Sequence, residues 1–192
     1  LRSKSCANWR TGLKSPRCDS VKPWRTPSSM SRLDAVIGRL KAQRSCLNAA
    51  VELLGDTPGH VLELGLGNGR TYDHLRNLFP NRNIYVFDKA VASHPDCRPP
   101  PDRLFLGAMA DTLVAAAAQL GATAALIHAD IGYGDAEATE RNVATIGPLL
   151  PGLLGQGGFV FCDQSLERIS EFKTIAMPSD VQAGRYYGYQ KA

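Results

Sequence analysis

The sequence predicts an α/β protein with a mostly parallel, doubly wound sheet of seven strands and helices on both faces. Short apolar runs at 61–64, 84–88, 103–106, 124–128 and 158–162 alternate with helical patterns at 70–79, 109–120 and 135–147. Such alternation is typical of parallel strands joined by crossover helices. Two further short runs, 172–176 and 185–190, are joined through Pro178 and Gly184 and predict a terminal strand pair.

A long helical pattern precedes the first strand. Ser31 with Asp34 three residues later resembles a capping box, and apolar residues recur at helical spacing across 33–54. Gly55 is a natural helix stop. We therefore expect one long helix, or two shorter ones, packed on the sheet. By contrast, the prolines within 95–101 predict a short helix or a loop between the second and third strands.

The turn after the first strand carries the strongest functional signal. Glu63 lies in this apolar strand, which breaks into Gly65-Leu66-Gly67-Asn68-Gly69 before an amphipathic helix. Glycines at such a turn let the backbone approach a ligand where a Cβ would clash. The next strand ends at Asp88, whose carboxylate is placed to accept both hydroxyls of a ribose. The pattern predicts a ligand that contains a nucleoside.

The glycine spacing separates two classes of such ligand. A dinucleotide fingerprint needs its third glycine at position 70, which is Arg70, and the chain has no phosphate-loop motif. Glu63, two residues before the first glycine, would repel a pyrophosphate but suits a cationic ligand. S-adenosyl-L-methionine fits, because it combines an adenosine with a sulfonium and an α-ammonium and has no phosphate.

Residues 60–88 resemble the class I, Rossmann-like S-adenosylmethionine-dependent methyltransferases in this E-x-G-x-G-x-G pattern and in the acid at Asp88. Segments such as ELGLGNGRTYDHLR and GRYYGYQKA are similar to a small bacterial methyltransferase family whose substrate is uncharacterised. The resemblance implies a Rossmann-like sheet that ends in a hairpin, with its final strand antiparallel to the others. It also implies an enzyme that moves a methyl group from S-adenosyl-L-methionine by in-line displacement.

The resemblance further implies where the cofactor binds. Ala108 stands where the family often has an acid for the adenine amino group. Met109 would pack on the adenine ring, and the competing interpretation is a core methionine. The expected cofactor-binding residues are Glu63, Gly65, Leu66, Gly67, Asn68, Gly69, Thr71, Asp88, Lys89, Ala108, Met109 and Asp130.

Two acids at the ends of later strands are the candidate catalytic residues. Asp130 is our preferred base or acceptor-orienting group, because the family often places a residue near the transferred methyl there. Asp163, after the fifth strand, is the second candidate. With Gln164 these acids also approximate the Mg²⁺ site of O-methyltransferases that act on catechol-like substrates, although we favour a site without metal. His128 is expected to be a satisfied core residue.

The aromatic residues near the chain end have two interpretations. Tyr186, Tyr187 and Tyr189 alternate partly with strand period, and we expect them to pack at the sheet edge. Lining a substrate pocket is the alternative.

The composition limits which binding partners and which cellular compartment we expect. Residues 1–29 carry +6 of the total formal charge of +4, so residues 30–192 carry −2, and no basic face for nucleic acid is implied. No apolar run has the length of a membrane span. The five cysteines are scattered, which suits a reducing cytoplasm. We expect a small-molecule or exposed acceptor and leave open whether the protein forms a homo-oligomer.

We expect residues 30–192 to form one domain that binds S-adenosyl-L-methionine. Residues 1–29 lack periodicity and are expected to be a disordered basic leader or an upstream extension. Two other functions stay open: a non-catalytic protein that binds S-adenosylmethionine or S-adenosylhomocysteine, and a nicotinamide-dependent oxidoreductase, which Arg70 and Glu63 disfavour.

Overall fold

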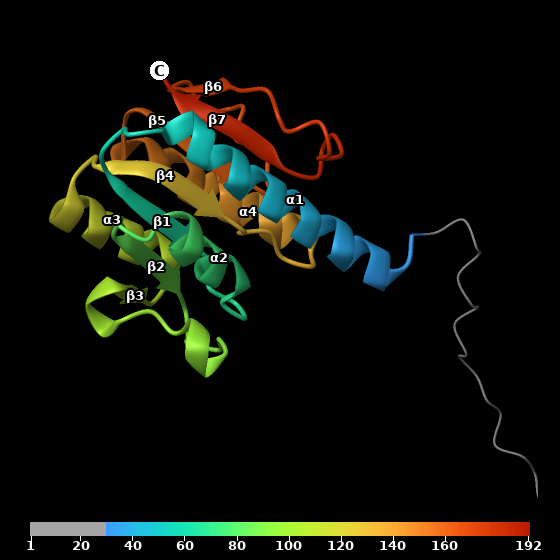
Figure 1. Ribbon diagram of the computed structural model, residues 1–192, viewed down its shortest axis with the longest axis horizontal. Helices are drawn as coiled ribbons and strands as arrows, with labels where there is room; N and C mark the ends of the chain where they lie inside the picture. The colour runs from blue at the N-terminus through green and yellow to red at the C-terminus, as the bar shows by residue number, and fades with distance from the viewer. Residues whose placement is uncertain (1–29) are drawn as a thin grey trace, which may run out of the picture.

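The computed structural model describes residues 30–192, so the expectations for residues 1–29 lie outside the described residues. Seven strands form one sheet in the order β3-β2-β1-β4-β5-β7-β6 (Figure 1). The first five strands are mutually parallel, and β7 is antiparallel to both β5 and β6. The predicted fold class and its terminal hairpin are confirmed. The strands are β1 His60–Leu64, β2 Ile84–Asp88, β3 Leu104–Leu106, β4 Ala124–Ala129, β5 Leu154–Cys162, β6 Phe172–Thr174 and β7 Tyr187–Lys191.

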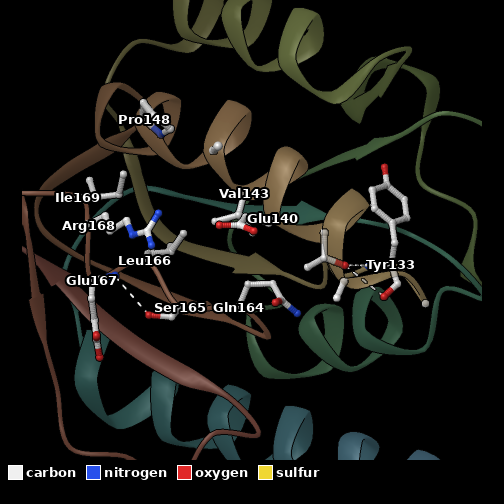
Figure 2. A pocket seen from close by; sticks show the side chains of 14 residues that line it. Tyr133, Glu140, Val143, Pro148, Gln164, Ser165, Leu166, Glu167, Arg168 and Ile169 are labelled. Carbon is white, nitrogen blue, oxygen red and sulfur yellow. Dashed lines mark hydrogen bonds between the residues drawn. The ribbon is translucent and has the colours of Figure 1, made fainter.

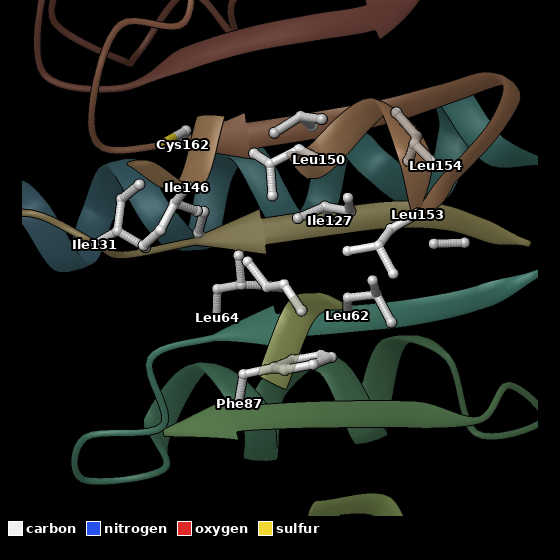
Figure 3. Close-up of a cluster of buried hydrophobic side chains, with 14 of the residues drawn as sticks. Leu62, Leu64, Phe87, Ile127, Ile131, Ile146, Leu150, Leu153, Leu154 and Cys162 are labelled. Atoms are coloured by element: carbon white, nitrogen blue, oxygen red, sulfur yellow. The ribbon is translucent and has the colours of Figure 1, made fainter. Parts of the chain in front are cut away.

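Helices cover both faces of the sheet because its central strands are apolar on both sides. Helices α1 (Arg32–Leu54) and α2 (Arg70–Leu78) pack on one face, against a cluster that includes Val61, Leu126 and Phe161. Helices α3 (Met109–Leu120) and α4 (Ala136–Ile146) pack on the other. Figure 3 shows this second cluster, with Leu62, Leu64, Phe87 and Ile127 pointing from the strands toward Leu150 and Ile146.

The N-terminal pattern forms one continuous helix of 23 residues. Its start is the expected cap, since the Ser31 hydroxyl accepts a hydrogen bond from the Asp34 backbone N–H at 3.0 Å. It ends at Gly55, which adopts a positive φ of 47°. The C-terminal half of α1 is buried against the sheet. Its N-terminal half projects past the carboxyl end of β4 (Figure 1). Helix α1 therefore lies beside the carboxyl ends of the parallel strands.

The fifth strand and the two hairpin strands differ in extent from the sequence prediction. Strand β5 begins at Leu154 rather than at 158, because Leu154 already pairs with Ala124 of β4. Residues 155–158 form an irregularity, and regular pairing resumes at Phe159. The hairpin strands are β6 and β7, shifted by one or two residues from the predicted runs. The proline-rich segment contains two 3-10 turns, Pro95–Cys97 and Pro101–Arg103. A further 3-10 helix, Gly147–Gly152, leads into β5.

The strand order creates a switch point between β1 and β4. The chain proceeds outward from β1 to β3 on one side, and from β4 to the hairpin on the other. In open α/β sheets, ligands bind outside the carboxyl ends of the strands at this point. Within residues 30–192, no helix is long and apolar enough to cross a membrane.

Two leucines on α1 test how this helix docks. Leu47 is fully buried, whereas the nearby Leu53 keeps 43% of its surface exposed. Leu47→Ala should lower the free energy of unfolding by roughly 2–5 kcal/mol because it leaves a cavity under the helix. The matched Leu53→Ala variant should lose less than about 1 kcal/mol. Urea denaturation measures both, and equal losses would contradict the docking described.

Candidate functional site

The glycine-rich turn connects β1 to α2 through three glycines with positive φ. Gly65, Gly67 and Gly69 have φ values of 95°, 47° and 82°. A Cβ on Gly65 would lie 2.7 Å from the Asp130 carbonyl oxygen, and one on Gly69 would lie 2.5 Å from the Cys97 Cβ. Gly67 differs, because a Cβ there would meet nothing within 4 Å. The turn is therefore packed at both ends and open in its middle, where a ligand can approach the backbone.

Asp88 ties the end of β2 to this open middle. Its Oδ2 accepts a hydrogen bond from the Gly67 backbone N–H at 3.1 Å. Its Oδ1 accepts one from the Lys89 N–H at 2.6 Å. The carboxylate is partly exposed and thus fixed at the rim of the turn. Predicted as a ribose acceptor, it lies beside the glycines as the sequence pattern required.

A groove of about 300 Å³ lies over the turn at the carboxyl ends of β1, β2 and β4. Five of the predicted site residues line it: Gly65, Gly67, Asp88, Lys89 and Asp130. The other residues that line it are Arg39, Ile131, Gly132, Tyr133 and Asn142.

Glu63 lies beneath the turn rather than in the groove. Its side chain is fully buried. One carboxylate oxygen accepts a hydrogen bond from the Thr71 hydroxyl, and the other lies 2.6 Å from Nδ1 of His128. Within the described residues, the charge of Glu63 is therefore matched by an internal partner. His128 is also fully buried and hydrogen-bonded, as expected of a satisfied core histidine.

The remaining predicted cofactor residues do not line the groove. Leu66 is buried in the α1–α2 cluster, and the Asn68 carbonyl accepts a hydrogen bond from the His94 N–H at 3.3 Å. Ala108 is the exposed cap residue of α3, and Met109 packs against the core on the α3–α4 face. Neither Ala108 nor Met109 lines the groove.

Asp130 at the end of β4 is engaged by α1. Its Oδ2 accepts hydrogen bonds from Arg39 Nη1 at 2.8 Å and from Gln43 Nε2 at 3.0 Å. Its Oδ1 makes no hydrogen bond among residues 30–192, and the residue lines the groove. The sequence analysis missed Arg39 and Gln43, because they lie 91 and 87 residues from Asp130 and no local motif marks them.

Asp163 supports the backbone after β4. Its carboxylate accepts hydrogen bonds from the backbone N–H groups of Ile131 and Gly132 at 2.9 and 3.0 Å, and from Gln164 Nε2 at 2.9 Å. Burial raises the pKa of Asp163, while the Gln164 and backbone hydrogen bonds oppose that shift. A Cβ at Gly132 would lie within 2.5 Å of the Asp163 and Gln164 side-chain ends, so both side chains would have to shift to admit one.

The hydrogen-bond donors around Asp163 disfavour the alternative in which Asp130, Asp163 and Gln164 bind Mg²⁺. The Asp163 oxygens face N–H groups, which would have to be displaced before a cation could bind. In the described part of the chain, no group of three or more His, Cys, Asp or Glu side chains has an arrangement suited to a metal ion.

A second and larger hollow of about 940 Å³ opens between α4 and the segment after β5 (Figure 2). Val143, Leu166 and Ile169 supply apolar surface. Glu140, Gln164 and Arg168 supply polar groups. Tyr133 lines both this hollow and the groove over the glycine turn, so the two spaces adjoin at that residue. Its ring is half exposed and lies 5.6 Å from Lys89 Nζ.

The tyrosines of the hairpin do not line either space. Tyr186 and Tyr189 are buried on opposite faces of the sheet, in the α1–α2 and α3–α4 clusters respectively. The sequence was right that these two residues pack rather than line a pocket, but wrong about the sheet edge, because β7 lies between β5 and β6 and both side chains enter the core.

Comparison with known proteins agrees with this geometry. A family model described as S-adenosyl-L-methionine methyltransferase matches residues 30–191. The crystal structure of an S-adenosyl-L-methionine methyl transferase from Silicibacter pomeroyi DSS-3 is 41% identical, with a TM-score of 0.81 over 85% of this chain and 100% of that one. No curated protein sequence is significantly similar to the chain.

A more distant structure shares the fold. A Staphylococcus aureus protein provisionally assigned as a caffeoyl-CoA O-methyltransferase is 10% identical, with a TM-score of 0.51 over 76% of this chain and 82% of that one. At this identity the likeness concerns the fold alone.

Two glycine substitutions should separate the packed end of the turn from its open middle. Gly65→Ala brings a Cβ against the Asp130 carbonyl at a strained φ and should lower the free energy of unfolding by roughly 2–4 kcal/mol. Gly67→Ala meets open space and should cost only about 1 kcal/mol. Denaturant titration of both variants checks this. A similar cost for both would show that β1 and β4 do not approach as closely as described.

Proposed function

Because the chain belongs to the S-adenosyl-L-methionine methyltransferase family, we propose that residues 30–192 bind this cofactor over the glycine turn and methylate a small molecule held in the adjoining hollow. The observation that carries the proposal is the junction at Tyr133, which lines both spaces. Methyl transfer requires donor and acceptor to meet in line at about 3 Å, so adjoining sites are what the reaction needs.

The groove suits the cofactor's adenosine and its positive groups. The open α-carbon of Gly67 leaves room for close backbone approach. The rim carboxylate of Asp88 can accept the ribose hydroxyls, and Lys89 and Asp130 line the same space. Ala108 and Met109 do not line the groove, so the proposed cofactor site rests on the turn, Asp88, Lys89 and Asp130.

The larger hollow suits a small acceptor. Its volume falls within the roughly 300–1,000 Å³ of ligand pockets, and it combines an apolar floor with a few polar groups. Residues 30–192 carry a formal charge of −2, which favours a small molecule over nucleic acid. The described cysteines, Cys46, Cys97 and Cys162, are free thiols, in keeping with our placement of the activity in a reducing cytoplasm.

Asp130 is the preferred residue for handling the acceptor. S-adenosyl-L-methionine supplies a methyl group on a sulfonium, so the protein's task is to orient the acceptor and receive its proton where it has one. Arg39 and Gln43 hold one oxygen of Asp130, and the other faces no described partner. Asp163 lines neither space, so it would act through the shape of the Ile131–Gly132 backbone, whose N–H groups it accepts.

Cofactor binding is tested by calorimetric titration of S-adenosyl-L-methionine. Asp88→Ala removes the acceptor for the ribose hydroxyls and for the Gly67 N–H. Affinity should therefore fall more than tenfold, as expected from a loss of about 2–4 kcal/mol. Glu52→Ala, which removes an exposed acid near the C-terminal end of α1, is the matched control and should bind like the parent protein. Unchanged binding in the Asp88 variant would refute the groove as the cofactor site.

The acceptor site is tested by formation of S-adenosylhomocysteine from S-adenosyl-L-methionine and fractions of a bacterial extract. We expect turnover with the low-molecular-mass filtrate. Ala144→Trp fills the larger hollow and should abolish that turnover while cofactor affinity is retained. Ala118→Trp, at an exposed site on α3, is the matched control. Turnover only with the macromolecular fraction would contradict a small-molecule acceptor.

A further inference from the structure

A chain of buried hydrogen bonds runs from the terminal hairpin to the glycine turn. The hydroxyl of Tyr186, just before β7, lies 2.7 Å from Nε2 of His128 on β4. The other ring nitrogen of His128 lies 2.6 Å from a Glu63 oxygen on β1. The second Glu63 oxygen accepts the hydroxyl of Thr71 in the first turn of α2. The chain thus joins four separate elements on the α1–α2 face of the sheet.

These groups lie deep in an otherwise apolar layer. Glu63 and His128 are fully buried and Tyr186 is 2% exposed. None of the three lines the groove or the larger hollow, so none is placed to touch cofactor or acceptor. A buried acid–imidazole pair gives little net stability compared with well-packed apolar residues. Its presence here therefore calls for a role other than simple stabilisation.

The geometry of the chain indicates what it holds. Glu63 lies two residues before Gly65, and its partner Thr71 lies two residues after Gly69, so one carboxylate ties both ends of the glycine turn. Gly69, the cap residue of α2, provides no side-chain hydrogen bond of its own. The orientation of Glu63 is set by His128, and that of the imidazole is set by Tyr186.

We propose that Tyr186 and His128 are positioning residues that act through Glu63 to hold the glycine turn in its cofactor-binding shape. The terminal hairpin would then be part of the cofactor site without contacting the cofactor. This inference rests on the family's cofactor and on the turn as its site. It does not depend on which acceptor is methylated.

The protonation of the chain follows from its surroundings. Burial lowers the pKa of His128, but the Glu63 carboxylate outweighs burial through its charge and hydrogen bond, helped by Asp130 and Asp163, so that the net shift is upward. Burial raises the pKa of Tyr186 well above its usual value, so the hydroxyl keeps its proton. When His128 carries both protons, Tyr186 accepts from Nε2 and can donate to the Ala129 carbonyl, 3.4 Å away.

Paired tyrosine substitutions test the proposal. Tyr186→Phe removes the hydroxyl that sets the His128 ring. Tyr189→Phe removes the hydroxyl of another buried tyrosine, which accepts from the Leu166 N–H on the opposite face. Calorimetry should show S-adenosyl-L-methionine binding weakened roughly three- to tenfold in Tyr186→Phe and changed less than about twofold in Tyr189→Phe. Denaturant titration of both variants gives the stability loss against which the binding loss is judged.

The outcomes separate this inference from the proposed function. If the parent protein shows no binding of S-adenosyl-L-methionine, the turn is not the cofactor site. If the parent binds and both tyrosine variants bind as tightly, the positioning role is refuted while the cofactor site stands. Equal weakening in both variants would also refute it, because a general loss of packing would explain that result.

Substitutions at Glu63 separate the effect of its charge and hydrogen bonds from the effect of packing. Glu63→Gln keeps the shape and hydrogen bonding but removes the charge, so it should retain more cofactor affinity than Glu63→Leu. Nitrogen NMR of the imidazoles should show His128 titrating above its ordinary pKa of about 6.5 in the parent and below it in Glu63→Gln. Equal affinity in the Leu variant and the parent would overturn the proposal.

The same chain sets a pH dependence of stability. Since the folded-state pKa of His128 is raised, its stabilisation is fully present below pH ~6.5 and is lost as pH rises through the folded-state value. The free energy of unfolding of the parent should therefore fall across that range more steeply than that of Glu63→Gln. Parallel pH profiles for the two proteins would contradict the charged pair.

Discussion

The close approach of β1 and β4 at their carboxyl ends is the constraint on which the site depends. The Asp130 N–H donates to the Leu64 carbonyl at 3.1 Å, and the Gly65 N–H donates to the Phe87 carbonyl at 2.9 Å. These bonds carry the sheet pairing one residue past the strands, so no side chain fits between Gly65 and the Asp130 carbonyl. The chain must then turn sharply away at positive φ. This turn leaves the Gly67 backbone facing open space at the switch point of the sheet.

Four carboxylates lie at or near strand ends around that turn, and their surroundings give them different tasks. Glu63 is buried and paired with His128, so its charge serves the interior. Asp88 stays at the rim and accepts from the Gly67 N–H of the turn and from the neighbouring Lys89 N–H. Arg39 and Gln43 both donate to one oxygen of Asp130, while the other makes no hydrogen bond among residues 30–192. Asp163 accepts from the Ile131 and Gly132 N–H groups and so fixes the backbone after β4. Chemically identical groups therefore differ because burial and partners differ.

The terminal hairpin and the first helix complete the site from opposite ends of the described chain. Tyr186 and Tyr189 are three residues apart, so they point to opposite faces of the sheet. Each ends in a hydrogen bond: the first to His128 beside the glycine turn, the second to the Leu166 N–H at the larger hollow. Helix α1 reaches the same edge through Arg39. Segments distant in sequence thus support both spaces, which explains how a compact domain forms two adjoining sites.

The sequence by itself determined the α/β alternation, the helix start at Ser31 and stop at Gly55, and the glycine turn with Asp88, because these rest on local periodicity, capping and backbone freedom. Only the tertiary structure decided what the carboxylates do. The Glu63–His128 pair spans 65 residues and the Arg39–Asp130 pair spans 91, and no local pattern encodes such contacts. The same holds for the start of β5 at Leu154, where pairing with β4 overrides the low strand propensity of glycine. Sequence patterns report interactions between residues that are close in the chain, whereas burial and charge pairing depend on which strands become neighbours.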